Sequence, residues 1–252
     1  MSGLRNFGVM NARGDILAFL DADCIVSNSW LKQSERYFKR EDIAAWGAPP
    51  VVPTKATWVQ KAWFFVRKKN QPVQTVEWLE SMNLFTRKKQ FIAVGGFNED
   101  LVTCEDVDLC YRLGKTGKII ADSSIVAIHL GEALTISSFF RKELWRGQSN
   151  FTGLFRHGFS MKELPSITIP IFYGLFLPII SLAAVVICRP LYFAFAIMLY
   201  LTPICVVLWR TRKKGACFKD LAHIFILIQV YFLARTVAVA LHKKHQNAAN
   251  SG

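Results

Sequence analysis

The sequence lacks paired cysteines of the kind that hold zinc or a disulfide framework. Its 252 residues contain six cysteines, and no two of them form a Cys-x-x-Cys pair. We therefore expect neither a zinc site nor a disulfide-stapled fold, and a reducing compartment fits better. The opening segment MSGLRNFGVMNARGD does not have the apolar core of a secretory signal peptide. Internal repeats and low-complexity tracts are also absent, and the length indicates one or two domains.

Acidic residues are scarce relative to basic ones. The chain has 18 Asp and Glu against 31 Lys and Arg, a net charge of +13, although 52% of its residues are hydrophobic and its mean hydropathy is +0.26. A chain that is both apolar and basic is typical of a membrane protein with a cationic cytoplasmic side. Nucleic acid is the other usual partner of a basic chain. Because the basic residues crowd next to apolar stretches, we expect a lipid bilayer and no nucleic acid.

Three apolar stretches, at about 167–188, 191–209 and 221–241, each have the ~20 residues needed to cross a bilayer. Pro178 and Pro203 are tolerable inside such helices. The third stretch contains His223, Gln229 and Arg235, so it either spans or is packed against its neighbours and only partly inserted. The sequence thus predicts a membrane domain at 167–241, followed by a tail at 242–252.

The charges that flank these stretches predict an orientation. Residues 139–166 mix aromatic and basic side chains, which is typical of an interfacial amphipathic segment. Basic residues precede the first stretch and follow the second, whereas only Arg189 lies between them. The positive-inside rule then predicts a multi-pass protein of the inner (plasma) membrane, with residues 1–138 and the 210–220 loop in the cytoplasm. Three full spans would export Lys243 and Lys244, a mild violation of the rule.

A short apolar run at 17–20 ends abruptly in two carboxylates, Asp21 and Asp23. A run of this length bounded by turn residues predicts a buried strand. Ligands of parallel α/β sheets bind just past the carboxyl ends of the strands, where two carboxylates with one spacer would suit Mg²⁺ or Mn²⁺. The alternative is that both aspartates merely start a loop.

Further strands are predicted at 43–52, 83–86 and 119–129, and helices at 30–40, 57–69, 90–94 and 105–114. Glu105 and Asp106 fall in the first turn of the last helix, where the helix dipole favours carboxylates without any catalytic role. His129 ends the last strand, and a lone histidine there is more often structural than a ligand.

Taken in series, several of these segments resemble one family. They are Arg5-Asn6-x-Gly8, AFLDADC, VGGFNEDL, CEDVDLCYRL and His129, which together look like the membrane-associated family-2 glycosyltransferases. The resemblance covers roughly residues 4–129. It implies an α/β, GT-A-like (Rossmann-like) nucleotide-sugar-binding domain within residues 1–138, with a UDP-sugar as the first candidate donor.

The resemblance also assigns roles at the donor side of the site. Asp23 would bind the Mg²⁺ or Mn²⁺ that holds the donor diphosphate. Asp21 would contact the nucleotide sugar or the metal shell, and Asn6 would contact the donor. His129 matches a position sometimes found near the metal. A metal that neutralises leaving phosphates agrees with the chemistry that sugar transfer needs.

At the acceptor side, the resemblance makes Asp106 the general base and Glu105 its support. It implies inversion at the anomeric carbon and a lipid-linked or cell-surface glycan as the acceptor. Processive members carry Gln-x-x-Arg-Trp, but here Trp145 precedes Arg146, which favours addition of a single sugar.

The chain departs from the family at its start, because nothing before Arg5 matches the strand, loop and aspartate that bind the nucleobase. We therefore expect an N-terminally truncated catalytic domain, with roughly 60–100 further codons upstream, one more α/β unit. The truncated chain would then have little transferase activity of its own.

Three other interpretations of the Asp-x-Asp segment compete with the glycosyltransferase interpretation. A haloacid-dehalogenase-type phosphatase would need Thr or Val after the pair, where Cys24 and Ile25 stand. An EF-hand loop would need Gly and Glu where Val26 and Lys32 stand. The serious alternative is a catalytically impaired, membrane-anchored partner subunit that keeps the fold without binding donor.

Overall fold

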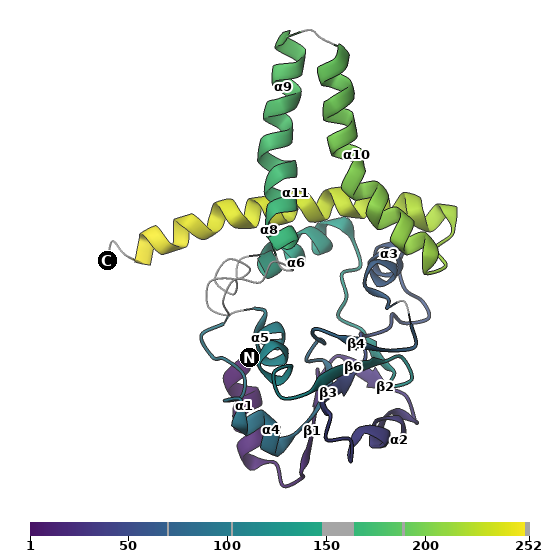
Figure 1. Ribbon diagram of the computed structural model, residues 1–252, viewed down its shortest axis with the longest axis vertical. Coiled ribbons are helices and arrows are strands. Elements are labelled where there is room, and N and C mark those ends of the chain that lie inside the picture. The colour runs from purple at the N-terminus through teal and green to yellow at the C-terminus, as the bar shows by residue number, and fades with distance from the viewer. Residues whose placement is uncertain (70, 102, 148–163, 188–189, 250–252) are drawn as a thin grey trace. The chain divides into compact units, whose positions relative to one another are not determined.

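The computed structural model describes residues 1–69, 71–101, 103–147, 164–187 and 190–249, which form two compact units (Figure 1). The first unit comprises Met1–Lys55 and Arg67–Glu132, and the second comprises Ala56–Val66 and Ala133–Gly252. The units differ from the expected domain at 1–138 in two respects, because both Ala56–Val66 and residues 133–138 group with the second unit. Most of the expected interfacial segment, residues 148–163, lies outside the described residues.

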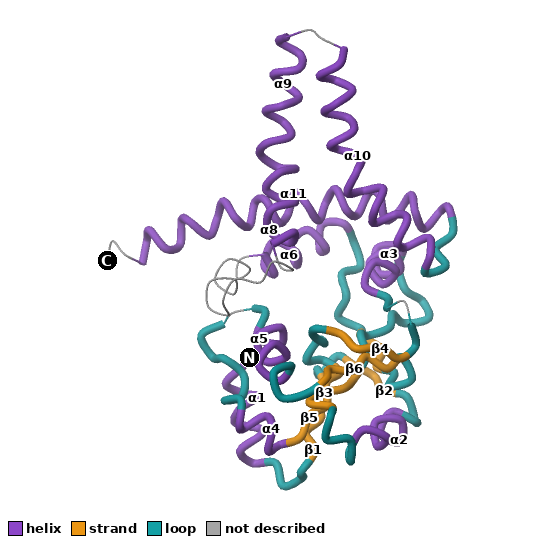
Figure 2. Tube along the Cα trace, in the orientation of Figure 1, coloured by secondary structure: helices purple, strands orange, loops and turns teal. Residues whose placement is uncertain are grey.

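The first unit is built on a mixed five-stranded sheet with the strand order β1-β5-β3-β6-β4 (Figure 2). Its strands are β1 (Ile16–Leu20), β3 (Ile43–Gly47), β4 (Val73–Val76), β5 (Asn83–Arg87) and β6 (Lys118–Asp122). Only β3 and β6 are parallel, and the other pairs are antiparallel. The expected parallel neighbours of the strand at 17–20 are wrong, since β1 lies at the edge and pairs with β5 alone among the described residues.

The central strands β3, β5 and β6 are buried on both faces, because they place apolar side chains alternately on each side of the sheet. Leu84 belongs to the core under helices α1 (Ser2–Asn11), α4 (Lys88–Ala93) and α5 (Glu105–Leu113). The next residue, Phe85, belongs to the opposite core, where it stacks on Trp46 with ring centroids 5.9 Å apart. That second core is closed by α2 (Trp30–Ser34) and the 3-10 turn η1 (Glu35–Tyr37), which together replace the single helix expected at 30–40.

A second, two-stranded sheet forms from β2 (Cys24–Val26) and β7 (Ala127–His129). The single strand expected at 119–129 is therefore wrong: β6 ends at Asp122, and the chain turns before β7 starts. The turn is held by Asp122, whose carboxylate accepts from the Ser124 N–H at 2.9 Å and from the Tyr37 hydroxyl at 2.6 Å. This break matters because it carries His129 out of the large sheet and beside the Asp21–Asp23 segment.

The second unit is helical. It contains α3 (Trp58–Arg67), whose last residue belongs to the first unit, and α6 (Ile136–Gly147). Two long helical arms follow. The first is made of α8 (Leu164–Ile171), the π-helical turn η2 (Phe172–Phe176) and α9 (Leu177–Ile187), and the second is α10 (Pro190–Lys213). The helix α11 (Phe218–Ala249) completes the unit. Leu191–Lys213 and Phe218–Val239 are long and apolar enough to cross a membrane, whereas Thr168–Ala183 is a shorter apolar helix.

Candidate active site

Asp23 and His129 meet through the pairing of two short strands. Cys24 lies opposite His129 in the β2–β7 ladder, and the Leu130 N–H donates to the Asp23 carbonyl at 2.9 Å. This register brings His129 Nε2 to 3.1 Å from Asp23 Oδ2. The two residues that the sequence predicts as metal ligands, 106 positions apart, are thus adjacent in the structure.

Gly131 leaves the space that the pair occupies. A Cβ atom built on Gly131 would lie 1.9 Å from Asp23 Oδ2 and 3.0 Å from His129 Nε2. Any side chain at this position would therefore displace the Asp23 carboxylate. Sequence reasoning did not identify Gly131, because a glycine just beyond the end of a strand resembles an ordinary loop residue.

His129 is oriented by a carboxylate on its far side. Glu132 Oε1 lies 3.2 Å from His129 Nδ1, and the Arg67 guanidinium donates to the same oxygen at 2.6 Å. The histidine and the glutamate are both buried. Metal-binding histidines usually donate their second ring N–H to a carboxylate, which fixes the tautomer and directs the other nitrogen at the metal. Glu132 and Arg67 complete that arrangement, and the sequence pattern had identified neither.

Arg5 joins the two acidic parts of the site. Its guanidinium donates to Asp21 Oδ1 and to Glu105 Oε1, each at 2.8 Å. The group also lies over the Phe97 ring, 5.4 Å from its centroid. Arg5 therefore offsets two negative charges and fixes the start of α5 beside the segment that follows β1. Asp21 points at this arginine, which is compatible with a supporting role at the donor rather than a metal ligand.

Asp106 lies in the first turn of α5, as expected from the sequence, and its side chain is half-buried. Its carboxylate accepts from the Val107 N–H at 2.9 Å and, weakly, from the Ser81 N–H at 3.4 Å. Desolvation by burial, and then the charges of Glu105 and Glu80, raise the pKa of Asp106 to about 7. A carboxylate with such a pKa can take up a proton near neutral pH.

Asn6 is occupied by the loop that precedes α5. Its side-chain amide donates to the Phe97 carbonyl at 2.9 Å and to Glu99 Oε1 at 2.8 Å, while its oxygen accepts from the Phe97 N–H at 2.9 Å. A Cβ on Gly96, which has φ +70°, would lie 2.9 Å from that oxygen. The structure thus shows Asn6 fixing the Gly96–Phe97 turn, and its expected contact with the donor stays a prediction.

The side chains at this site suit a divalent metal that is coordinated by the protein and by phosphate oxygens together. Within the described residues there is no group of three or more His, Cys, Asp or Glu side chains able to hold a metal. Asp23 and His129 supply two converging donors, an oxygen and a nitrogen, with no third protein ligand. Mg²⁺ and Mn²⁺ commonly keep one or two protein ligands and complete their shell with phosphate oxygens and water. The residues therefore fit a metal that is bound together with a diphosphate.

Comparisons with known proteins bear on the family and the fold. Residues 1–97 match the model of "Glycosyl transferase family 2". This part of the chain is similar to that family. The chain also aligns with "Pre-mycofactocin glycosyltransferase" of two Mycobacterium tuberculosis strains, at 26% identity over 163 residues. The alignment covers 61% of this chain and 34% of each relative, so it spans about a third of the length of the curated relatives it matches.

Among solved structures, the chain is similar to "Mannosyltransferase PcManGT from Pyrobaculum calidifontis in complex with GDP-Man and Mn2+". The similarity has a TM-score of 0.51 at 12% sequence identity, and it covers 96% of this chain and 65% of that chain. At this identity the likeness shows the fold, which is that of the GT-A glycosyltransferases.

We predict that Gly131→Ala leaves the first unit folded but weakens Mn²⁺ binding about 10–100-fold, the usual cost of disturbing a ligand's surroundings. The fold should survive because the Asp23 side chain is 48% exposed and can swing into solvent. Its carboxylate would then leave His129. Mn²⁺ affinity, measured by electron paramagnetic resonance without any donor, checks the prediction. Gly8→Ala is the matched control, since a Cβ there meets nothing within 4 Å. Equal Mn²⁺ affinities of both variants and wild type would contradict it.

Proposed function

We propose that this chain is an inverting glycosyltransferase that moves a sugar from a nucleotide-sugar donor to a glycan or lipid-linked acceptor. The observation that carries the proposal is the convergence of Asp23 and His129 near α5, the helix that carries Asp106. Arg5 connects the two, since it donates to Asp21 and to Glu105 at the start of α5. A metal–diphosphate site and a carboxylate of raised pKa are the two groups that such a transfer needs. The match of residues 1–97 to the family-2 glycosyltransferase model supports the same reaction class.

The residues divide the work between donor and acceptor. Asp23 and His129 would hold a divalent metal, Mg²⁺ or Mn²⁺, which when bound neutralises the departing phosphates. Asp106 accepts the proton of the acceptor hydroxyl as its oxygen forms the new bond to the anomeric carbon and the bond to the diphosphate breaks. A single displacement of this kind inverts the anomeric carbon. Arg5 and Glu105 hold Asp106 at the N-terminal end of α5, and neither of them donates or accepts a proton in the reaction.

A second candidate is a partner subunit that keeps the fold but does not bind donor. It is favoured by the engagement of both expected donor contacts within the protein, Asp21 by Arg5 and Asn6 by Phe97. The two candidates differ in one measurable property, which is metal-dependent binding of the donor nucleotide. A subunit that does not bind donor has no use for a metal at the Asp23–His129 pair.

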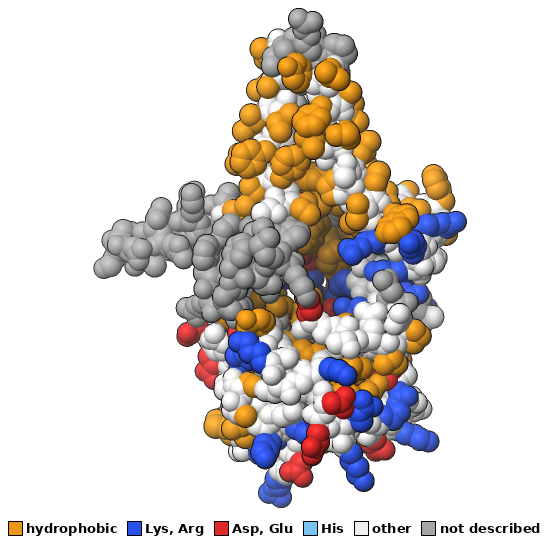
Figure 3. Space-filling model, in the orientation of Figure 1, with side chains coloured by type: hydrophobic (Ala, Val, Ile, Leu, Met, Phe, Trp, Pro, Cys, Tyr) orange, Lys and Arg blue, Asp and Glu red, His pale blue; other side chains and the backbone are white. Residues whose placement is uncertain are grey.

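We also propose that the catalytic unit works at the cytoplasmic face of the inner membrane, with the second unit as its anchor. Two helices, Leu191–Lys213 and Phe218–Val239, have the length and apolarity for a bilayer. Figure 3 shows hydrophobic side chains covering the α9 and α10 arms, which fits lipid contact. An acceptor carried by the membrane would then reach the site without leaving the bilayer surface.

Binding of nucleoside diphosphates tests the proposed function directly. Calorimetric titration with UDP and GDP should show binding that strengthens at least tenfold with Mn²⁺ and is lost with a chelator. The nucleotide that binds more tightly would identify the donor class, and transfer assays with its sugar derivatives would follow. Absence of Mn²⁺-dependent binding to either nucleotide would favour the partner subunit.

A further inference from the structure

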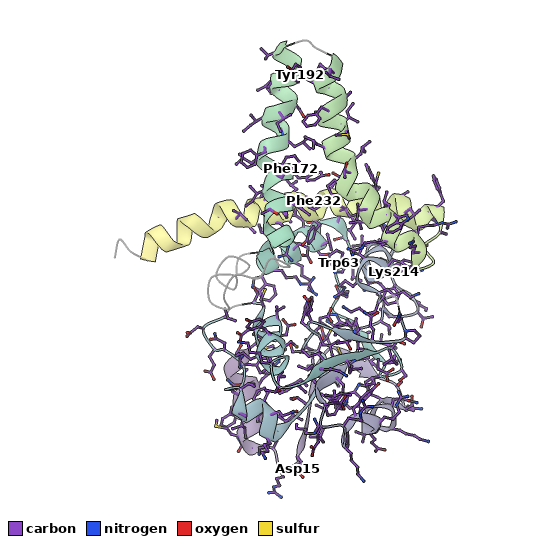
Figure 4. All side chains as sticks on the ribbon, in the orientation of Figure 1. Asp15, Trp63, Phe172, Tyr192, Lys214 and Phe232 are labelled. Carbon is purple, nitrogen blue, oxygen red and sulfur yellow. The ribbon has the colours of Figure 1, made fainter. Side chains whose placement is uncertain are left out.

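The long helix α11 is fixed to α3 along its N-terminal half. The Trp58 and His223 rings lie 4.8 Å apart, and the Trp63 and Tyr231 rings lie 5.7 Å apart. Figure 4 labels Trp63 on α3 and Phe232 on α11, which belong to one packed apolar cluster. Yet α3 is not a lipid-facing helix, since Lys61 is exposed on it and Thr57 and Gln60 cap its start.

The C-terminal half of α11 is fixed to α6 by a buried ion pair. Arg235 donates from Nη2 to Glu143 Oε2 at 2.8 Å, and Arg146 donates to Glu143 Oε1 at 2.6 Å. The Glu143 side chain is 0% exposed. Just beyond, a Cβ on Gly147 would lie 2.6 Å from the Ala238 Cβ, so the two helices touch backbone to backbone. Breaking this contact would leave buried charges without partners.

These contacts leave little of α11 free to cross a bilayer. They run from His223 to Ala238, about 22 Å of helix at 1.5 Å per residue, against a hydrocarbon core of about 30 Å. A spanning α11 would therefore draw α3 and α6 across most of that core. The twelve residues of α6 include Arg141, Lys142, Glu143 and Arg146, and ionised side chains are expensive at that depth.

The two arms, α8–α9 and α10, differ from α11 both in charge and in how much of their surface is packed against other helices. Apart from Arg189, which lies outside the described residues, the sequence from 164 to 209 has no Asp, Glu, Lys or Arg. Large apolar side chains on these arms are exposed, including Leu182 at 65%, Leu191 at 77% and Met198 at 55%. Within the second unit, α11 crosses the two arms part-way along them rather than running beside them (Figure 1). Thr236 of α11 donates to the Pro170 carbonyl, and Tyr200 donates to Gln229 of α11.

The base of the arms has the composition of a membrane–water boundary. Lys213 Nζ lies over the ring of the exposed Trp209, 3.7 Å from its centroid, at the end of α10. Lys214 donates to the Val66 carbonyl at the end of α3, at 3.1 Å. Tryptophan with basic residues is typical of the headgroup region, and the positive charge suits anionic phospholipid. The α3 end therefore lies at that level, and α11 starts there.

We propose that the two arms enter the bilayer only beyond their contacts with α11 at Pro170 and Tyr200, and that α11 lies in the headgroup plane with α3 and α6. The inference rests on the membrane attachment proposed above. It removes the third span considered from the sequence, and it keeps Lys243 and Lys244 on the same side as the catalytic unit. The positive-inside rule is then obeyed throughout.

Depth measurements on the full chain test this placement. A fluorescent amino acid would be introduced singly at Ile226 or Leu233 of α11, which are seven residues apart and 44% and 57% exposed. Leu191 and Met198 of α10 form the matched pair with the same spacing. Depth would be measured by quenching with brominated lipids, in vesicles of phosphatidylethanolamine and phosphatidylglycerol. Seven residues along a spanning helix correspond to about 10 Å of depth.

The expected result is equal, shallow depths for the two α11 positions and a difference of about 10 Å for the α10 pair. A difference of about 10 Å within the α11 pair as well would overturn the in-plane helix and leave the membrane proposal standing. Lack of quenching at all four positions would overturn membrane attachment itself, and the in-plane helix with it. Neither result would bear on donor binding, which is measured separately.

Discussion

Asp106→Asn is expected to lower the turnover of sugar transfer by about 10²–10⁴-fold, the usual worth of general-base catalysis. The amide has the shape of the carboxyl group and can still accept from the Val107 N–H, but it cannot take up the acceptor proton. Mn²⁺-dependent binding of the nucleoside diphosphate should be unchanged. Asp42→Asn, at an exposed aspartate paired only with Arg40 and Lys118, is the control and should transfer normally. An Asp106→Asn variant with normal turnover would show that another group is the base.

The pH dependence adds an independent signature of Asp106. Because its pKa is raised to about 7, kcat/KM of the wild type should fall as the pH drops below about 7 and the carboxyl group becomes protonated. The sign for stability is opposite: a carboxyl whose folded pKa exceeds its ordinary value stabilises the fold at low pH, and this contribution is lost between about pH 4 and 7. At pH 8, Asp106→Asn should therefore melt no lower than wild type, which separates lost activity from lost folding.

The structure places Asp23 beside His129 and Asp106 in the first turn of α5, as the motifs predicted, while their roles stay predictions. The sheet that carries them was predicted less well. The strand at 17–20 was recognised from its apolar run, but its neighbours were wrong because period and composition do not report pairing partners. The break between β6 and β7 was missed as well. It depends on Asp122 capturing Ser124 and Tyr37, a tertiary contact with no local signature.

The residues that sequence reasoning missed act on others rather than on substrate. Gly131 matters through the space it leaves, Glu132 through the far nitrogen of His129, and Arg5 through the two carboxylates it joins. Each effect needs the three-dimensional neighbour to be known. Arg5 did carry a signal, because it opens the Arg5-Asn6-x-Gly8 segment of the family resemblance, but the segment alone does not say what the arginine contacts.

Asp23→Ala is expected to abolish the Mn²⁺ dependence of nucleoside diphosphate binding. The substitution removes one of the two protein donors that the described residues bring together at the site, whereas disturbing a ligand's surroundings alone already costs about 10–100-fold in metal affinity. The affinity with Mn²⁺ should fall to the value measured with a chelator, as titration calorimetry would show. The fold should persist, because the Leu130 N–H bonds to the Asp23 backbone carbonyl rather than to its side chain.

Asp21→Asn is the matched control for this experiment, since it changes the neighbouring carboxylate of the same turn. Asp21 is held by Arg5 and not by His129, so its amide should keep the Mn²⁺ dependence even if donor affinity falls. The pair of variants thus separates a metal ligand from a carboxylate that acts through Arg5. Retained Mn²⁺ dependence in Asp23→Ala, or its loss in Asp21→Asn alone, would reverse the two roles and place the metal on the Arg5 side of the turn.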